Sequence, residues 1–505
     1  MTRRPNVLFL MSDHTNAQAL APGSQCQTPN LDALAAEGRR FHRCTTTNAI
    51  CSPARASLLT GTYPSTHGVW DCTHVQHKRW VDIEPGLAHW ARHLAAAGYR
   101  NGYFGKWHAD QSNRPQDFGW HEVDLSCSDA KPAPVAGTEV VARNPGYRDY
   151  LLATEGEDDP GAPGLRHPAY DRGIDFIRQA AGEGQPFCCF ISTGEPHDAY
   201  VPPGRFLRLY DIDRIQPSPT LRDELTGKPE VLKRMRDVWK DLSDRDWKMV
   251  SACYWATISF LDHEVGRAID ALCQAGVHDD TIIVFTSDHG DMLGGHGLAT
   301  KGVGTAYEEV YNIPLILRVP GEKGTGSFSP SEKVPVPFSP GAPKQRGQTP
   351  FFTQRKKESV PFAEDHHTYV SLVDLGPTLL DYCSAEPLPK AQGRSLRPVL
   401  EGSADPADWE DAYAEFFSQR FGYTQRIVWH GRWKFIFSPG GIDELYDLAA
   451  DPHERTNLAD LPAHRPTLLE TNRRMWRKMK EIDDWSLFNT GYASLRTAVV
   501  GPLEE

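Results

Sequence analysis

The sequence predicts an α/β fold built on a large, mostly parallel central sheet. Short apolar runs that end on polar turns alternate with helical patterns along most of the chain, as in "NVLFLMSD" and "TIIVFTSDHGD". Apolar runs of this kind are typical of strands buried on both faces of a sheet. Strands that alternate with helices favour a parallel sheet with helices flanking it.

The helices and strands follow one another in a regular order. The first helix is expected at "TPNLDALAAEGRRF", with Thr28 as its N-cap, Pro29 in its first turn and Gly38 at its end. Three helix and strand pairs then follow, and a last helix is expected at "YVSLVDLGPTLLDYC". The pairs are "GLAHWARHLAAAG" with "RNGYFGKWH", "RGIDFIRQAAGEG" with "PFCCFISTGEPH", and "VSACYWATISFLDHEVGRAIDALCQAG" with "TIIVFTSDHGD".

The chain is expected to form two domains, a larger α/β domain over 1–385 and a smaller C-terminal α+β domain over 386–505. The end of the chain differs in character, because "RIVWHGRWKFIFSPGGIDELYDLAADPHERTNLAD" predicts antiparallel strands joined by a turn and followed by a helix. Residues 321–366 or so are rich in Pro, Ser, Gly and charge, which indicates a long insertion. We expect a homo-oligomer in which this insertion acts as an arm between subunits.

Charge and composition exclude several classes of partner. A formal net charge of -12 offers no general attraction to nucleic acid or to an anionic membrane surface. The N-terminal apolar run "VLFLM" is too short for a secretion signal or a membrane span. The ten cysteines form no CxxC pair and are interpreted as reduced thiols. These features predict a cytoplasmic protein that binds neither nucleic acid nor membrane.

Polar and charged side chains follow the predicted strands at the edge where ligands bind in parallel sheets. Two aspartates with an imidazole can hold a divalent cation, and lysines with an arginine make an electropositive pocket for a tetrahedral oxyanion. The residues at these strand ends are Asp13 and His14, Lys106 and His108, His197, Asp288 and His289, and Lys301 after a glycine-rich loop.

The stretch "CSPARASLLTG" adds Cys51 at the start of a helix, with Arg55 one turn further on. A cysteine in this position is either buried and inert or chemically used. The following run, "GVWDCTHVQHKRW", either lines a substrate pocket or is a solvated loop. Its candidate pocket residues are Trp70, Asp71, His74, His77 and Lys78.

The chain resembles the type I, formylglycine-dependent sulfatases of the alkaline-phosphatase-like superfamily. The resemblance is carried by "PNVLFLMSD", "TPNLDALAAEGRRF", "CSPARASLLTG", "GYFGKWH", "SDHGDMLGGHG" and "LYDLAADPHERTNLA". It implies an alkaline-phosphatase-like α/β fold with a small C-terminal sheet domain. It also implies that a formylglycine-generating enzyme oxidises Cys51 to formylglycine. Ala54 stands where many relatives have serine, but the C-x-P-x-R pattern remains.

The resemblance further implies how the site is used. One divalent metal would be held by Asp13, Cys51, Asp288 and His289, with Ca²⁺ expected and Mn²⁺ as its competitor. His14 replaces an aspartate of many relatives and is a ligand, a neighbour of the ligands or neither. Arg55 and Lys106 would support the formylglycine. Asp288 would deprotonate the hydrated aldehyde, His197 or Lys301 would protonate the leaving alcohol, and His108 would act in the release of sulfate.

Three functions remain open at this point. The favoured one is hydrolysis of an O-sulfate ester in a small substrate whose alcohol is an aryl group, a choline-like cation or a sugar. The second is hydrolysis of phosphonate monoesters or phosphodiesters by the same aldehyde. The third is an unmodified, non-catalytic protein that binds oxyanions through the same pocket.

Overall fold

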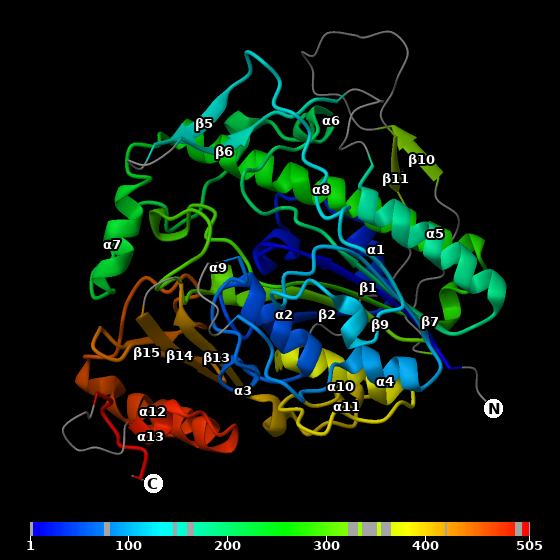
Figure 1. The fold of residues 1–505 in the computed structure, drawn as a ribbon. Helices are drawn as coiled ribbons and strands as arrows, with labels where there is room; N and C mark the ends of the chain where they lie inside the picture. Colours follow the sequence, from blue (N-terminus) through cyan, green and yellow to red (C-terminus); the bar gives the residue numbers. More distant parts are fainter. Residues whose placement is uncertain are drawn as a thin grey trace.

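A computed structural model shows the fold of the chain (Figure 1). It describes residues 4–74, 81–144, 149–158, 166–321, 332–335, 351–354, 365–419, 422–489 and 497–503. Within these ranges, no helix combines the length and the apolar character needed to cross a membrane.

An eight-stranded sheet forms the centre of the described structure, in the order β12-β2-β9-β8-β1-β7-β3-β4. β9 runs antiparallel to its neighbours β8 and β2, and the other pairings are parallel, which confirms a mostly parallel sheet. The strands are β1 (Asn6–Ser12), β2 (Arg39–Thr45), β3 (Arg100–Gly105), β4 (Glu122–Asp124), β7 (Phe187–Ser192), β8 (Thr281–Ser287), β9 (Asn312–Arg318) and β12 (Asp365–Ser371).

Helices cover both faces of this sheet, with α1, α5 and α8 on one side and α2, α4 and α10 on the other (Figure 1). Alternate side chains of β1 enter the two cores: Leu8 and Leu10 pack with the first set of helices, and Val7 and Phe9 pack with the second. The helices are α1 (Pro29–Glu37), α2 (Cys51–Thr60), α4 (Trp90–Ala96), α5 (Pro168–Glu183), α8 (Asp244–Gln274) and α10 (Leu372–Tyr382).

Two local expectations were wrong. Thr28 stands at the N-cap position of α1, but its side chain makes no capping hydrogen bond. Instead, the buried carboxylate of Asp262 in α8 accepts from the backbone N–H groups of Asn30 and Leu31, at 3.2 and 2.8 Å. The segment "YVS" before α10 is the end of strand β12 and not helix.

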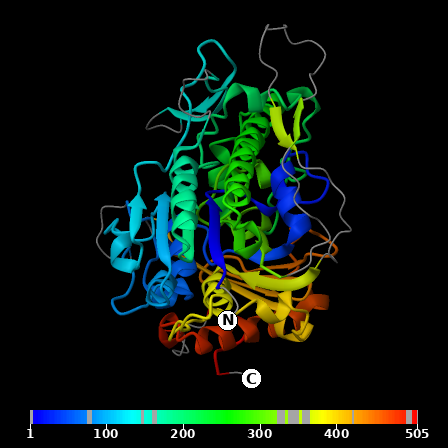
Figure 2. The same cartoon turned by 90° about the vertical axis from the view of Figure 1, so that its right-hand side faces the viewer.

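The C-terminal part forms an antiparallel four-stranded sheet with a helix against it, as predicted. Figure 2 shows this sheet and α12 at one end of the molecule, away from α5 and α8. The elements are β13 (Asp411–Ser418), β14 (Gly422–His430), β15 (Trp433–Phe437), β16 (Glu444–Asp447) and α12 (Arg465–Glu481).

The boundary after residue 385 stays a prediction. Leu388, Leu396 and Val399 lie beyond that boundary and pack in the same core as α2 and α4. Most of the predicted insertion lies outside the described residues, apart from the paired strands β10 (Glu332–Pro335) and β11 (Phe351–Gln354).

The remaining described α-helices and β-strands are short. They are α3 (Pro64–His67), α6 (Gly204–Leu207), α7 (Glu230–Asp237), α9 (Glu308–Tyr311), α11 (Arg397–Leu400), α13 (Ser486–Asn489), β5 (Val140–Arg143) and β6 (Tyr150–Thr154).

Candidate active site

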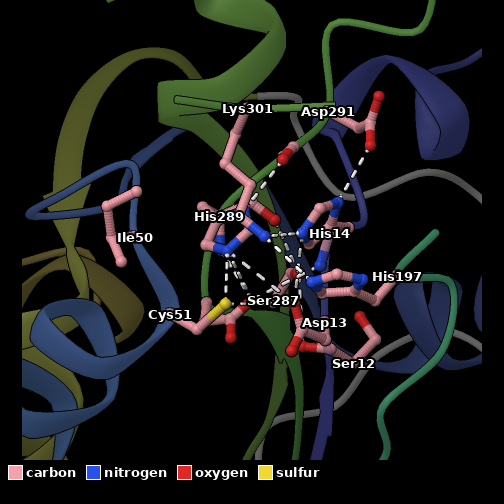
Figure 3. A network of polar contacts seen from close by, with 12 residues as sticks. Ser12, Asp13, His14, Ile50, Cys51, His197, Ser287, His289, Asp291 and Lys301 are labelled. Atoms are coloured by element: carbon pink, nitrogen blue, oxygen red, sulfur yellow. Dashed lines mark hydrogen bonds and ion pairs between the residues drawn. The ribbon is translucent and has the colours of Figure 1, made fainter. Parts of the chain in front are cut away.

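The strand-end residues meet at one edge of the central sheet (Figure 3). The strands that carry them, β8, β1, β7 and β3, are consecutive neighbours in the sheet. Their carboxyl ends therefore lie side by side, and the chain leaves each of them toward the same space. Cys51 is the first residue of α2, and its side chain lies in this space at the N-terminus of the helix. The structure thus brings together the side chains that the sequence predicted to be neighbours.

Four donor atoms converge in the predicted metal site, one each from Asp13, Cys51, Asp288 and His289, and lie within 4.8 Å of one another. The Sγ atom of Cys51 is 3.1 Å from Nε2 of His289 and 3.7 Å from Oδ1 of Asp13. All four side chains are buried. Two carboxylates and an imidazole around one point fit a divalent cation.

The orientation of His289 supports this interpretation. Its Nδ1 atom lies 2.9 Å from the carbonyl oxygen of Gly290, which can only accept a hydrogen bond. Nδ1 therefore carries a proton, and Nε2 is the ring atom that faces the other three donor groups. Burial lowers the pKa of His289, but Asp288 and Cys51 outweigh burial and raise it, so a metal at Nε2 would bind in place of a proton.

The two carboxylates differ in electrostatic environment. Burial raises the pKa of Asp13, but Lys106, His197, His14 and Arg55 outweigh burial and hold it well below its usual range. Burial and the nearby Asp13 carboxylate raise the pKa of Asp288, although Arg55 opposes this. A divalent cation between the two would relieve their repulsion.

Arg55 fixes one side of the site. Its Nε atom donates to Asp288 at 2.8 Å, and Nη1 donates to the hydroxyl of Ser192 at 2.8 Å and to the carbonyl of Lys106 at 3.0 Å. Nη2 is buried without a hydrogen-bond acceptor and lies 3.6 Å from Oδ2 of Asp13. This N–H group can donate a hydrogen bond to an oxyanion at the site. The Lys106 ammonium also contacts Asp13.

Lys301 lies between two imidazoles, with its Nζ atom against Nε2 of His14 and 3.1 Å from Nε2 of His197. The Nδ1 atom of His197 lies 2.8 Å from the carbonyl oxygen of Asp198, so this nitrogen carries the proton. The Nε2 atom of His197 consequently accepts a hydrogen bond from the Lys301 ammonium.

His14 is held by a residue that the sequence analysis did not single out. Its Nδ1 atom lies 2.9 Å from Oδ2 of Asp291, which also accepts from the hydroxyl of Tyr200 at 2.7 Å. His14 has a left-handed backbone, with φ 72°, a strained conformation that often occurs at functional sites. The sequence feature that could have identified Asp291 as a site residue is its position within "SDHGD", two residues after His289.

A cleft of about 740 Å³ opens beside these residues. Lys106, His108 and His197 line it together with His74, so these four predicted residues share one opening. The other lining residues are Thr73, Gly105, Trp107, Gln111, Asn113, Leu125, Ser126, Ser128, Asp129, Lys131 and Gly194.

Two predicted pocket residues lie elsewhere. The Trp70 ring stacks on Phe417 of the C-terminal sheet, with centroids 4.6 Å apart, and on Trp485 at 5.5 Å. Asp71 is buried and its Oδ1 accepts from the backbone N–H of Cys72. Neither lines the cleft. His77 and Lys78 lie outside the described residues.

The comparisons with known proteins agree with this geometry. A family model described as Sulfatase matches residues 5–385. The chain belongs to the sulfatase family. The match confirms the sulfatase family, which the ordered motifs along the chain predicted, and the enzyme class, a sulfuric ester hydrolase. Solved sulfatase structures confirm the fold. A second model, described as the C-terminal part of N-sulphoglucosamine sulphohydrolase, matches residues 346–483.

Individual relatives span nearly the whole of this sulfatase. The choline-sulfatase of Rhizobium meliloti (strain 1021) is 27% identical over 501 residues, which cover 91% of this chain and 83% of the relative. The N-acetylglucosamine-6-O-sulfatase of Bacteroides thetaiotaomicron is 27% identical over 534 residues, covering 90% and 83%. The phosphonate monoester hydrolase of Agrobacterium radiobacter shares the fold, with a TM-score of 0.70, 23% identity and coverage of 95% and 96%.

Proposed function

We propose that this sulfatase hydrolyses the O-sulfate ester of a small polyhydroxylated alcohol, with formylglycine at position 51 as the nucleophile. The observation that carries the proposal is the position of Cys51, whose Sγ atom lies among the metal donors while Arg55 and Lys106 line the same space. A hydrated aldehyde at position 51 supplies two hydroxyl groups, one for attack on sulfur and one for release of sulfate.

Asp13, Asp288 and His289 would hold the metal together with residue 51. A divalent cation there would polarise sulfate oxygens and acidify a hydroxyl group. The Nε2 atom of His289 would be a nitrogen ligand, which favours Mn²⁺ over Ca²⁺, the ion expected from the resemblance. Asp288, with its raised pKa, is the stronger base of the two carboxylates and suits removal of the first proton.

Lys301 is the better candidate for protonating the leaving alcohol. The Nδ1–H group of His197 donates a hydrogen bond to the Asp198 carbonyl. Burial, and to a lesser extent the charge of Lys301, lowers the pKa of His197 to about 2. The Nε2 atom of His197 therefore carries no proton to give, whereas Lys301 carries protons beside it. His197 and His14 hold the Lys301 ammonium in place.

His108 suits the second proton transfer, the one that accompanies release of sulfate. It lines the cleft, and its Nδ1 atom is buried without a hydrogen-bond partner. Burial, Lys106 and Arg55 lower the pKa of His108 well below its usual range, so the ring would enter this step neutral and would readily pass the proton on to solvent.

The lining of the cleft supports a polyhydroxylated alcohol, such as a sugar, over a choline-like cation. A quaternary ammonium group is bound by exposed aromatic faces. Apart from histidines, the one aromatic side chain among the described lining residues is Trp107. It is buried against Tyr103 and Phe118, with ring centroids 5.2 and 5.5 Å away. The side chains that line the cleft instead offer many hydrogen-bond donors and acceptors, as sugar hydroxyls require.

The proposal is tested by comparing kcat/KM for a sulfated monosaccharide, choline sulfate, an aryl sulfate and a phosphonate monoester. We expect the sulfated sugar to react fastest. Faster turnover of the phosphonate would overturn the preference for sulfate, and faster turnover of choline sulfate would overturn the substrate class. A protein that carries formylglycine and hydrolyses none of the four would contradict the proposal as a whole. A cytoplasmic location and a homo-oligomeric state stay predictions.

A further inference from the structure

A second group of side chains that could bind a metal does not include the carboxylates around Cys51, and two of its three members line the cleft. Cys72, His74 and His108 each offer a ligand atom, and these atoms lie within 4.8 Å of one another. The Nδ1 atom of His74 is 3.2 Å from a ring nitrogen of His108, Nε2. One thiol and two imidazoles form a softer donor set than the two carboxylates and imidazole of the catalytic site.

The segment that carries Cys72 and His74 is anchored on both sides. The backbone N–H of Thr73 donates to the hydroxyl of Ser52 in α2 at 3.1 Å. The carbonyl of Thr73 accepts from Nε2 of Gln111 at 3.2 Å. These two hydrogen bonds fix the residue between Cys72 and His74, so the two potential ligands are held toward His108 before any ion binds.

His108 contributes a nitrogen without another partner inside the protein. Its Nδ1 atom is buried and makes no hydrogen bond. The backbone of His108 is left-handed, with φ 51°, which is uncommon for a residue with a side chain. A buried ring nitrogen without a hydrogen-bond partner costs free energy, and a metal ion bound at that atom would offset this cost.

We propose that Cys72, His74 and His108 form an inhibitory site for a borderline-soft divalent cation, Zn²⁺ being the fitting ion. Three protein ligands would leave one coordination position for solvent, as in other zinc sites with an open position. Binding would replace the thiol proton of Cys72 with the metal and release that proton to solvent. Burial raises the pKa of the Cys72 thiol to about 12, so the metal itself must drive this deprotonation.

Inhibition would follow because the same imidazole serves two purposes. His108 bound to Zn²⁺ cannot accept the proton in the step proposed for sulfate release, and the ion would stand at the opening that His74, Lys106 and His197 share. This consequence rests on the proposed function, whereas the metal site itself rests on the three ligands alone.

The site is tested with Co²⁺ as a spectroscopic stand-in for Zn²⁺, in the Cys51→Ser protein, whose catalytic site has no thiol. Thiolate bound to Co²⁺ gives a sulfur-to-metal charge-transfer band. We expect this band in the Cys51→Ser protein and its loss in Cys51→Ser/Cys72→Ser. The matched control, Cys51→Ser/Cys273→Ser, removes an exposed thiol and should keep the band. Absence of the band, or a band that survives Cys72→Ser in a folded protein, would overturn the site.

Inhibition is tested separately, in enzyme that carries formylglycine. We expect Zn²⁺ to inhibit hydrolysis of the sulfate ester, and Cys72→Ser to raise the Zn²⁺ concentration for half inhibition at least about tenfold. Equal sensitivity of both proteins would overturn the inhibitory role and the assignment of His108, even if the cobalt band had supported the site.

Discussion

The Nε2 atom of His289 lies 3.1 Å from the Sγ atom of Cys51, and both side chains are closed off from solvent. The hydrogen bond from His289 to the carbonyl of Gly290 sets this orientation. Residue 51 and a histidine ring nitrogen therefore face the same point, together with the carboxylates of Asp13 and Asp288.

Replacing His289 by alanine should weaken metal binding and slow sulfate ester hydrolysis at least about 100-fold, because a divalent cation supplies several kcal/mol of charge stabilisation in such a site. Metal content per chain and kcat measure the two effects. Treatment with a chelator should reproduce the loss, with recovery greater in Mn²⁺ than in Ca²⁺. The exposed His453 provides the control variant, His453→Ala, which should leave both quantities unchanged. Full activity in metal-free protein would contradict the metal site.

The variant Lys301→Ala should slow the hydrolysis of a sugar sulfate about 10²–10⁴-fold and slow that of an activated aryl sulfate much less. The reason is that a poor leaving group needs a proton and a good one does not. The matched control is Lys106→Ala, which removes a charge from the same site and should slow both substrates by similar factors. Equal losses for the two substrates in Lys301→Ala would show that Lys301 is not the acid.

The contacts of His14 predict a positioning role. Since its two ring nitrogens meet Asp291 and Lys301, His14→Ala should keep one metal ion per chain while kcat falls about 10–100-fold. Asp291→Asn should act in the same direction. Metal content and kcat, measured on the same samples, distinguish a positioning role of His14 from a role as a metal ligand. If the metal is lost together with activity, His14 is a ligand and the positioning role is wrong.

Unmodified Cys51 should ionise at an unusually low pH. Burial and Asp13 raise the pKa of its thiol, but Lys301, Lys106 and His289 outweigh them and bring it to about 6. In metal-free protein made without conversion of Cys51, the thiol should be neutral well below pH 6 and a thiolate above it. Ultraviolet thiolate absorbance against pH measures this step, which should vanish in Cys51→Ser. A first thiolate that forms only near the usual pH of cysteine would contradict the predicted electrostatics.

A buried ion-pair network ties the C-terminal sheet to α9. The Nζ atom of Lys434 in β15 lies 2.9 Å from Glu308 of α9 and 2.8 Å from Glu454. Removing one partner from a buried charge network leaves the others unpaired, so Lys434→Ala should lower the free energy of unfolding by about 3–5 kcal/mol. Urea denaturation measures this loss. The exposed pair of Lys240 and Asp237 supplies the control, because Lys240→Ala should cost less than about 1 kcal/mol.

Much of the fold was predictable because burial leaves a clear pattern. The strands that carry the site are continuous apolar runs, since both their faces are covered. Strand β2, "RRFHRCT", was not predicted, because its arginines and histidine hide the period of a strand. The predicted N-cap of α1 was wrong because the carboxylate that accepts hydrogen bonds from its first N–H groups, Asp262, lies far away in the sequence.

The site, like the fold, could be predicted only in part. Residues just after predicted strands were expected to lie together, because parallel strands share one carboxyl edge. The roles of Asp291 and Tyr200 could not be predicted, since they depend on a contact between distant loops. Trp70 was predicted to line the pocket, yet it stacks on Phe417 across the domain contact. An exposed pocket and a domain interface both favour aromatic residues, so composition cannot separate them.

The most direct test of the account is peptide mapping of residue 51 by mass spectrometry, combined with activity toward a sulfated sugar in the same preparations. Samples with different degrees of conversion are obtained by expression with and without a formylglycine-generating enzyme. We expect formylglycine at position 51, with activity proportional to its fraction and absent from protein that keeps the thiol. Full activity in protein whose residue 51 is entirely cysteine would contradict it.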